Sequence, residues 1–291
     1  MTRPVVIIPV HNRRATTLAC LGRLAANGDL RDFEVLVIDD GSTDGTSEEI
    51  ARLHPGVLVR RGDGTLFWGG AIAAGMRTAL DAGPRQLIWL NDDCLPRPGT
   101  LPGLVAALEA DPGSIVVPRC VVTGTGAAWP NGFTGRRRVT GRDGETLRLD
   151  GASGYCAGVG STVSSALGPV DAVRFPHYCA DTAYTLKASR GGFAVLLAGS
   201  LVVDLVDPGR EVHRIEDHVD PRVAFSTNAR RIFFSKKSPF RLRTVLSLQQ
   251  QKRGVVLGTL EAGVKAATWI TALLKNHGRH GKPASTNPPG T

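Results

Sequence analysis

The first 120 residues alternate short apolar runs with amphipathic stretches, and this alternation restricts the fold more than any other feature. The pattern predicts strands at residues 5–10, 33–38, 57–60, 86–90 and 114–118, and helices at 14–26, 46–53, 71–82 and 100–110. Repeated β-α-β units with short connections build an α/β fold, a mainly parallel sheet flanked by helices on both faces. Ligands of such sheets bind beyond the carboxyl ends of the strands, so the residues that follow each strand are the candidates for function.

After residue 120 the regular alternation stops. Residues 121–155 are rich in glycine and contain three consecutive arginines, a composition that indicates a hairpin or a flexible excursion. The later predicted elements are a helix at 181–189, strand-like runs at 193–197 and 201–206, and helices at 223–234, 240–251 and 255–275. The tail from Asn276, rich in Gly, Pro, Ser and Asn, is expected to be disordered.

The cysteines and the hydropathy indicate a cellular compartment. The five cysteines are odd in number and far apart, without a Cys-x-x-Cys pair, which argues against a disulfide framework or a structural zinc site. The strand at residues 5–10 begins too early for a signal peptide, and no run of about eighteen uncharged apolar residues predicts a spanning helix. We therefore expect a cytoplasmic protein.

The positive charge lies in the last third of the chain. Residues 209–291 contain 15 Lys and Arg against 5 Asp and Glu, whereas residues 1–208 contain 20 against 21. Such a basic block suits nucleic acid, anionic lipid or an anionic acceptor, and a solvated surface without a partner explains it equally well.

Three polar residues follow the fourth predicted strand. The four bulky residues Leu87–Leu90 indicate a strand buried on both faces, and Asn91, Asp92 and Asp93 come directly after it. Two adjacent carboxylates repel each other and are costly to bury unpaired. A Mg²⁺ or Mn²⁺ ion with a diphosphate removes that cost, because both ions prefer hard oxygen ligands. An acidic turn that closes the strand is the alternative.

The first two strands also end in polar residues. Strand 5–10 leads into His11 and Asn12, and strand 33–38 leads into a run of carboxylates, hydroxyls and glycines at 39–46. Turns and a helix cap explain part of that run, but capping does not require the adjacent pair Asp39 and Asp40. An aspartate at this strand end can accept hydrogen bonds from a base imide or a ribose hydroxyl.

Three segments together resemble the signature of family 2 glycosyltransferases, in order and in spacing; they are residues 8–12, 38–46 and 90–93. The resemblance covers about residues 4–120, and it implies a GT-A fold, an inverting mechanism and a nucleotide diphosphate sugar bound with Mg²⁺ or Mn²⁺. The domains expected from it are a nucleotide-sugar-binding half at 1–120, an acceptor-binding and catalytic half at 121–220, a basic helical region at 221–275 and a disordered tail at 276–291.

The resemblance also implies roles for single residues. The residues carried over to the nucleoside pocket are Pro9, His11, Asn12 and Asp40, the last of them meeting the base. In the acidic motif, Asp93 would ligate the metal and Asp92 would lie near the ribose. Asn91 replaces the usual aspartate, which removes one possible ligand and predicts a modest metal affinity.

A glycine-rich segment at residues 62–71 precedes the third predicted helix. It lacks the Gly-Lys-Ser/Thr of a Walker loop and resembles a segment of some rhamnosyltransferases in this family. Gly69 and Gly70 would let the backbone approach the donor, and Trp68 would stack on it. A turn with a buried Trp68 is the alternative.

Asp181 is the candidate catalytic base. The segment 175–181 resembles the family's acceptor-side motif, whose acidic residue takes the proton of the acceptor hydroxyl as it attacks the anomeric carbon. One displacement gives inversion, so the paired carboxylates of glycoside hydrolases are not required. Residues 154–158 would form the floor of the acceptor site, and a helix N-cap is the alternative role for Asp181.

Two assignments stay open. A further contact to the leaving group or the metal has three candidates, which are Asp204, Asp207 and His213. His213 and His218 are five residues apart, poor spacing for one helical face, which favours ordinary loop histidines. Basic and apolar residues alternate in the C-terminal region, which suits either peripheral binding to the anionic inner face of the plasma membrane or packing onto the catalytic domain.

We therefore predict an inverting, metal-dependent hexosyl- or deoxyhexosyltransferase. It would move a sugar from a dTDP- or UDP-sugar to a hydroxyl of a saccharide or polyprenyl-linked acceptor. The alternatives are a nucleotide-sugar-binding module without catalysis and a basic nucleic-acid-binding protein. No nucleic-acid reader module is recognisable, so nucleic acid is not an expected partner. A dehydrogenase is disfavoured because no Gly-x-Gly-x-x-Gly follows the first strand.

Overall fold

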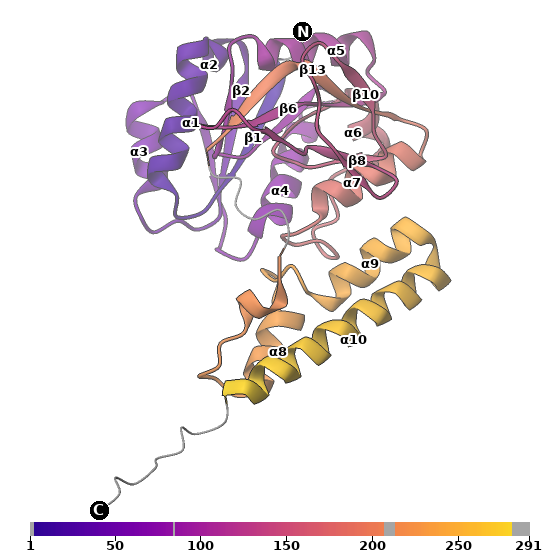
Figure 1. Cartoon of the computed structure of the whole chain (residues 1–291). Helices are drawn as coiled ribbons and strands as arrows, with labels where there is room; N and C mark the ends of the chain where they lie inside the picture. The colour runs from indigo at the N-terminus through magenta and orange to yellow at the C-terminus, as the bar shows by residue number, and fades with distance from the viewer. Residues whose placement is uncertain (1–2, 84, 207–212, 281–291) are drawn as a thin grey trace, which may run out of the picture. The chain divides into compact units, whose positions relative to one another are not determined.

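The computed structural model describes residues 3–83, 85–206 and 213–280, and the chain divides into two compact units, Met1–Gly209 and Arg210–Thr291 (Figure 1). The strands of the first unit are β1 (Val5–Val10), β2 (Glu34–Asp39), β3 (Leu58–Arg61), β4 (Leu87–Leu90), β5 (Cys94–Pro96), β6 (Ser114–Val122), β7 (Ala128–Trp129), β8 (Gly132–Thr134), β9 (Arg137–Val139), β10 (Thr146–Arg148), β11 (Gly151–Ala152), β12 (Cys156–Val159) and β13 (Ala194–Leu205). Its helices are α1 (Arg14–Asn27), α2 (Asp29–Asp32), α3 (Thr46–Leu53), α4 (Phe67–Asp81), α5 (Thr100–Ala110), α6 (Ser161–Leu167) and α7 (Ala180–Arg190). The second unit contains the 3₁₀ turn η1 (Ile215–His218) and the helices α8 (Phe225–Phe233), α9 (Leu242–Arg253) and α10 (Val255–His280).

The main sheet is mixed, with a parallel half that carries the predicted strand ends. Its strand order is β10-β13-β6-β12-β4-β1-β2-β3. The strands β3, β2, β1 and β4 are parallel neighbours, whereas β12 lies antiparallel between β4 and β6. The register pairs Val10 with Asp39 and Asp39 with Arg61, so β1, β2 and β3 end at one edge. The predicted α/β sheet flanked by helices is confirmed.

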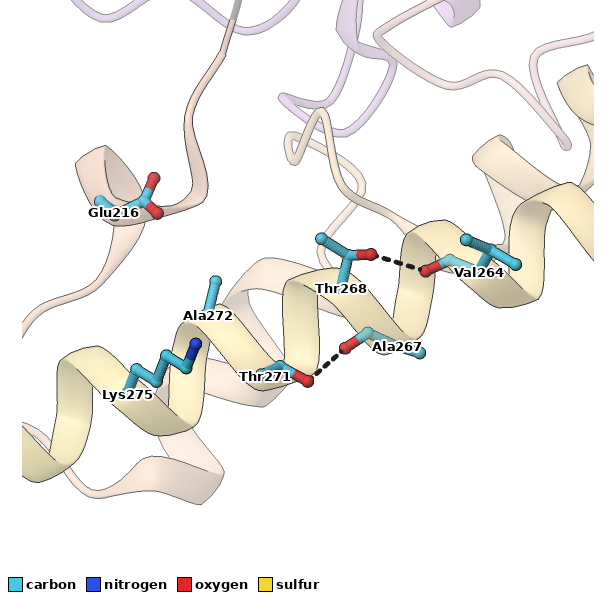
Figure 2. A pocket seen from close by; sticks show the side chains of 7 residues that line it. All are labelled: Glu216, Val264, Ala267, Thr268, Thr271, Ala272 and Lys275. Atoms are coloured by element: carbon cyan, nitrogen blue, oxygen red, sulfur yellow. Dashed lines mark hydrogen bonds between the residues drawn. The ribbon is translucent and has the colours of Figure 1, made fainter.

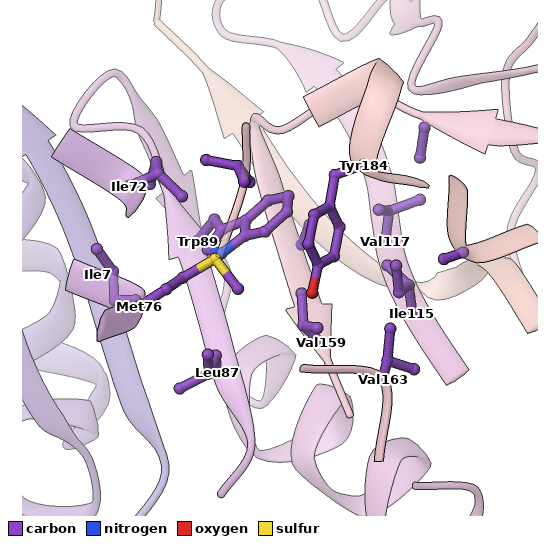
Figure 3. Packing of buried hydrophobic residues seen from close by; sticks show 14 of the residues in the cluster. Ile7, Ile72, Met76, Leu87, Trp89, Ile115, Val117, Val159, Val163 and Tyr184 are labelled. Atoms are coloured by element: carbon purple, nitrogen blue, oxygen red, sulfur yellow. The ribbon is translucent and has the colours of Figure 1, made fainter. Parts of the chain in front are cut away.

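The central strands are apolar on both faces because helices cover each side. Along β1, Val5 and Ile7 belong to one buried cluster, whereas Val6 and Ile8 belong to the other, as the two-residue period of a strand requires. The first cluster packs under α4 and α7, where Trp89 contacts Tyr184 edge to face at a ring-centroid distance of 5.2 Å (Figure 3). The second cluster packs under α1, α3 and α5 and includes the buried free thiols of Cys20, Cys94, Cys120 and Cys156.

Several predicted boundaries were wrong. Helix α4 begins at Phe67, four residues before the predicted start, because the side chain of Asp40 accepts the backbone amides that open this helix. Strand β6 continues to Val122. The two predicted strand-like runs near residue 200 form the single strand β13, with an irregularity between Ala198 and Val202.

Residues 121–155 contain the predicted hairpin. Strands β8 and β9 pair antiparallel, and β11 joins them in a small three-stranded sheet.

The second unit has a core of its own, formed by Ile215, Ile232, Phe233, Phe240 and Leu273. Its long helix α10 continues to His280, so residues 276–280, predicted to be disordered, are helical; the rest of the predicted tail lies outside the described residues. Within the described part of the chain, no helix is both long enough and apolar enough to cross a membrane.

Two helical glycines differ in their surroundings, and we expect their alanine variants to change stability in opposite directions. A Cβ on Gly75 of α4 would lie 2.4 Å from a methyl group of Ile7, whereas a Cβ on Gly22 of α1 would meet nothing within 4 Å. Gly75→Ala should lower the free energy of unfolding by about 1–3 kcal/mol because it overpacks the core. Gly22→Ala should raise it by ~0.5–1 kcal/mol because alanine favours the helix. Urea denaturation measures both, and two changes of the same sign would contradict the packing described for α4.

Candidate active site

The carboxylate of Asp40 organises the loop between β3 and α4. Asp40 is buried directly after β2. Its Oδ1 accepts hydrogen bonds from the amides of Gly64 (2.9 Å) and Leu66 (3.1 Å), and its Oδ2 accepts one from Phe67 (2.8 Å). Charge-assisted bonds of this kind contribute about 1.5–3 kcal/mol each. The contact of Asp40 with a base stays a prediction, and in this structure its carboxylate fixes the start of α4.

His11 and Asn12 attach the end of β1 to the loop after β2. Nδ1 of His11 lies 2.6 Å from the carbonyl oxygen of Asp40, so Nδ1 carries the proton and Nε2 accepts from Nδ2 of Asn12 at 3.3 Å. The amide of Asn12 donates to the hydroxyl of Ser42 (2.8 Å), and its Oδ1 accepts from the amide of Thr43 (2.8 Å). Both side chains therefore lie at the sheet edge where a ligand of such a fold binds.

Asp39 stabilises the same loop from within the sheet. Its fully buried carboxylate accepts the amide of Ser42 (2.9 Å) and the hydroxyl of Ser47 at the start of α3. The adjacent carboxylates of Asp39 and Asp40 thus hold two different loops, the one between β2 and α3 and the one between β3 and α4.

Trp68 connects the glycine-rich segment to the acidic motif. Its indole Nε1 donates to Oδ1 of Asn91 at 2.7 Å, and its ring meets Trp89 edge to face at 6.1 Å between centroids. The amide of Asn91 donates to the carbonyl of Tyr155 at 2.9 Å. Trp68 is only partly buried, and Asn91, the neutral residue of the motif, positions its ring. Stacking of Trp68 on a donor remains a prediction.

Gly69 and Gly70 are buried in the first turn of α4. The amide of Gly69 donates to the carbonyl of Pro176 at 2.8 Å, and a Cβ on Gly69 would lie 2.2 Å from the carbonyl oxygen of Phe175. Glycine is required here because the backbone of another segment lies where a side chain would start. This close approach attaches the segment before α7 to α4, and both the acceptor-side role of that segment and an approach of the donor to these glycines stay predictions.

Asp92 and Asp93 share one cation, Arg13, at the amino end of α1. Nη2 of Arg13 is 2.9 Å from Oδ2 of Asp93, and its Nε is 3.4 Å from Oδ1 of Asp92. Asp92 also accepts the hydroxyl of Thr17 at 2.9 Å. Burial raises the pKa of Asp92 to about 6, although Arg13 and Thr17 oppose the shift. The side chain of Asp93 is 22% exposed against 3% for Asp92, so Asp93 is the accessible carboxylate.

The acidic motif fits a divalent ion only in company with a donor. Among the described residues, no three His, Cys, Asp or Glu side chains gather into a set that could hold a metal. Mg²⁺ and Mn²⁺ accept one or two carboxylates and complete their shells with water and substrate phosphates. Asp93 and a diphosphate are therefore a sufficient set, while Asp92 stays bonded to Thr17.

Asp181 lies in the first turn of α7, and Gly154 lies close to both Asp181 and the ring of Trp68. Its Oδ2 accepts the amide of Gly154 (2.6 Å), and its Oδ1 accepts the amide of Thr182 (2.7 Å). A Cβ on Gly154 would lie 2.8 Å from the Trp68 ring and 2.9 Å from Cβ of Asp181. Burial raises the pKa of Asp181 against these two amide bonds. The N-cap of α7 is Cys179, so Asp181 is not the N-cap residue that the sequence offered as an alternative.

The predicted site residues divide into those that reach the sheet edge and those that support it. Those at the edge or in contact with it are His11, Asn12, Asp40, Trp68, Asn91, Asp92, Asp93 and Asp181. Pro9 lies within β1, paired with Ile38 of β2, one residue before the strand ends.

The three candidates for a further contact to the leaving group or the metal lie in different parts of the chain. Asp204 on β13 binds Arg97 through Nη2 (2.8 Å) and Nε (3.1 Å), an ion pair of its own. His213 belongs to the second unit, where its ring lies 5.8 Å from that of His218. Asp207 lies outside the described residues.

Three non-glycine residues in the loops around this site have strained backbone conformations. The non-glycine residues Asn12, Phe67 and Cys179 adopt φ angles of 51°, 55° and 68°. Such left-handed conformations cost ~1–3 kcal/mol each and persist where surrounding contacts hold them. Here the hydrogen bonds of Asn12 and the bond from Phe67 to Asp40 are those contacts.

Two residues at the site were not predicted from the sequence. Arg13 pairs with both carboxylates of the acidic motif, and the ring of His177 lies edge to face with Phe67 (6.0 Å) and Tyr178 (4.7 Å). A signal for Arg13 was present, since paired carboxylates require a cation and Arg13 follows the first strand motif directly. Nothing comparable distinguished His177.

Comparisons with known proteins identify the family of this chain. The family model described as Glycosyl transferase family 2 matches residues 5–161. The chain is 30% identical to polyprenol monophosphomannose synthase of Mycolicibacterium smegmatis over 204 residues, 67% of this chain and 75% of that relative. It is 32% identical to undecaprenyl-phosphate mannosyltransferase of Micrococcus luteus over 142 residues, 47% of this chain and 56% of that relative.

The fold is also found among solved structures. The mannosyltransferase PcManGT from Pyrobaculum calidifontis, in complex with GDP-Man and Mn²⁺, aligns with a TM-score of 0.54 at 20% identity, over 95% of this chain and 79% of that one. Both curated relatives carry mannose in their names, so the expected likeness to rhamnosyltransferases gains no specific support from them. The family match covers more than half of the sequence, and the chain belongs to glycosyl transferase family 2.

Proposed function

We propose that this chain transfers a sugar, with mannose as the first choice, from a nucleoside diphosphate sugar to a polyprenyl phosphate. One observation carries the proposal: the accessible carboxylate of Asp93 follows β4 at the same sheet edge where Trp68, held by Asn91, lies beside Gly154 and Asp181. A donor bound at Asp93 would thus extend toward Asp181 and the acceptor side. The choice of mannose and of polyprenyl phosphate rests on the names of the two curated relatives.

The residues at the edge suit a single inverting displacement. Asp93 would hold a Mg²⁺ or Mn²⁺ ion together with the donor's diphosphate, and such an ion, when bound, neutralises the charge that develops on a departing diphosphate. His11, Asn12 and Asp40 border the position expected for the nucleoside. Trp68 would shield the reacting sugar from water, because its ring is fixed by Asn91 and by Trp89.

The role of Asp181 depends on the acceptor. A phosphate acceptor is already ionised at neutral pH, so its oxygen attacks without a general base. A hydroxyl acceptor, the second candidate, must lose a proton as it attacks. The observation that favours it is Asp181 itself, a residue of intermediate exposure near Trp68 whose carboxyl pKa is raised by burial. The two acceptors therefore differ in whether they require Asp181 as a general base.

The first prediction concerns donor binding. We expect one of GDP, UDP and dTDP to bind in the presence of Mn²⁺ and to lose about tenfold or more in affinity when a chelator is added. Asp93→Asn should bind that nucleotide equally weakly with and without the ion, because the accessible ligand is gone. Isothermal titration calorimetry measures both effects.

A control for that experiment is Asp32→Asn, an exposed carboxylate on α2. It should behave as the wild type. A folded wild type that binds none of the three nucleotides would refute the proposed donor site. Metal-dependent binding that survives in Asp93→Asn would show that a residue other than Asp93 holds the ion.

The second prediction decides between the acceptors. With polyprenyl phosphate as the acceptor, Asp181→Asn should lower kcat by less than about tenfold, because no proton has to be removed. A loss of ~10²–10⁴ would instead identify a hydroxyl acceptor with Asp181 as its base. In that case kcat of the wild type would fall on acidification through the raised pKa of Asp181, at higher pH than for an ordinary aspartate. Steady-state transfer from a radiolabelled donor measures kcat of the variant and the pH dependence of the wild type, with the exposed Glu109→Gln as the matched control.

A lipid acceptor also requires a surface that meets the membrane, and α10 offers one. Val256, Leu257, Leu260 and Val264 are 62–72% exposed. Farther along the helix, Figure 2 shows a hollow lined by Val264, Ala267, Thr268, Thr271, Ala272, Lys275 and Glu216. The hydroxyls of Thr268 and Thr271 donate to carbonyls of the same helix, at 3.0 and 2.9 Å, so they do not require water. We therefore propose that this face of α10 lies in the interface of an anionic membrane, with the basic excess of residues 209–291 as its electrostatic complement.

The third prediction tests that surface. Leu257→Ser combined with Leu260→Ser should reduce partitioning onto phosphatidylglycerol vesicles by at least about tenfold, because burial of each leucine contributes ~1.5–3 kcal/mol. Leu53→Ser combined with Leu58→Ser changes two leucines of the first unit with similar exposure, 45% and 51%, and should have little effect. Vesicle co-sedimentation gives the comparison, and equal partitioning of both double variants would refute a membrane role for α10.

A further inference from the structure

Arg13 is a cation in direct contact with both carboxylates of the acidic motif. Arg13 lies between the end of β1 and the first residue of α1, and this places it at the same sheet edge as the acidic motif. Its Nη2 lies 2.9 Å from Asp93 and its Nε 3.4 Å from Asp92. Its side chain is 43% exposed, which leaves the guanidinium access to solvent and room to move.

The two carboxylates hold Arg13 in different ways. Asp92 is buried and has a second partner in the hydroxyl of Thr17, so it has a fixed place. Asp93 is accessible, and it forms an ion pair with Arg13. Of the two contacts, the one to Asp93 is therefore the one that can be exchanged without exposing a buried charge.

Together these contacts create a conflict at Asp93. The proposed divalent ion requires the same oxygens that Arg13 occupies, and a guanidinium within a few ångströms of a doubly charged ion is repelled in a partly buried site. A donor diphosphate resolves the conflict, because the planar guanidinium matches phosphate oxygens as well as it matches a carboxylate.

We propose that Arg13 is an exchangeable counter-ion: it neutralises Asp93 in the free protein and moves to the donor's diphosphate when the metal takes Asp93. The inference rests on the proposed donor site. It makes Arg13 a donor-binding residue, and it couples the binding of metal and nucleotide. Metal alone must displace Arg13 from Asp93 and leaves it with its contact to Asp92, whereas metal with a diphosphate gives the guanidinium a new partner. By linkage, each ligand then raises the affinity for the other by the same factor.

The experiment measures Mn²⁺ binding without any turnover. Free Mn²⁺ is quantified by electron paramagnetic resonance while protein is titrated, first without nucleotide and then with GDP or, in parallel, UDP. Arg13→Gln should bind Mn²⁺ alone about three- to tenfold more tightly than the wild type, because the competing cation is removed. Its affinity for the nucleotide in the presence of Mn²⁺, measured by calorimetry, should fall about tenfold, so the coupling between the two ligands should largely disappear.

Two further variants keep the test decisive. Arg13→Lys retains the charge beside buried Asp92 and should fold normally; its affinity for Mn²⁺ alone should stay near the wild type, whereas nucleotide binding should weaken because lysine lacks the planar fork. Arg14→Gln changes the neighbouring exposed arginine and should leave both affinities unchanged. Thermal unfolding checks that each variant is folded.

The outcomes separate this inference from the donor site itself. An Arg13→Gln variant that is folded and binds Mn²⁺ alone no more tightly than the wild type would overturn the counter-ion role. A wild type that binds no nucleotide with Mn²⁺ would refute the donor site, and the measurement with Mn²⁺ alone would still decide whether Arg13 competes for Asp93.

Discussion

The site depends on one buried carboxylate, that of Asp40, which accepts three backbone amides from the loop that opens α4. Because these bonds fix Phe67 in a left-handed conformation, the following residue, Trp68, is directed toward Asn91. Gly69 then lies where its amide reaches Pro176, in the segment before α7. A single charged group at the end of β2 thus sets the position of the start of α4 against residues that lie more than 100 positions later in the sequence.

The same edge shows how a parallel sheet tolerates a high density of aspartates. Asp39 and Asp40 are satisfied by amides and a hydroxyl, and Asp92 by Thr17 and Arg13. Asp93 is left as the accessible carboxylate, held by an arginine that is itself half exposed. Buried carboxylates therefore serve as hydrogen-bond acceptors within the fold, and Asp93 is the carboxylate of the motif that solvent reaches.

Much of the fold was predictable because its elements follow from local patterns. The apolar run of β4 has to be covered on both faces, and helices on both faces cover it. The predicted bounds of β1, α3 and α5 agree with the structure. The start of α4 was not predictable, because helix propensity in residues 67–70 is low and the helix opens there through a side chain 27 residues away. The pairing of Arg13 with Asp92 and Asp93 is likewise a contact between distant segments: the sequence signals that the carboxylates need a cation, but only the sheet brings Arg13 within reach of them.

The sequence by itself determined the class of the fold and the positions at which polar residues leave the sheet, since periodic burial and strand-end chemistry are local properties. Family membership followed from the order and spacing of those same segments. Only the tertiary structure decided how the carboxylates divide their tasks. Whether an aspartate accepts a backbone amide, pairs with an arginine or remains accessible depends on which distant groups the sheet brings within hydrogen-bonding distance, and a list of residues does not contain those distances.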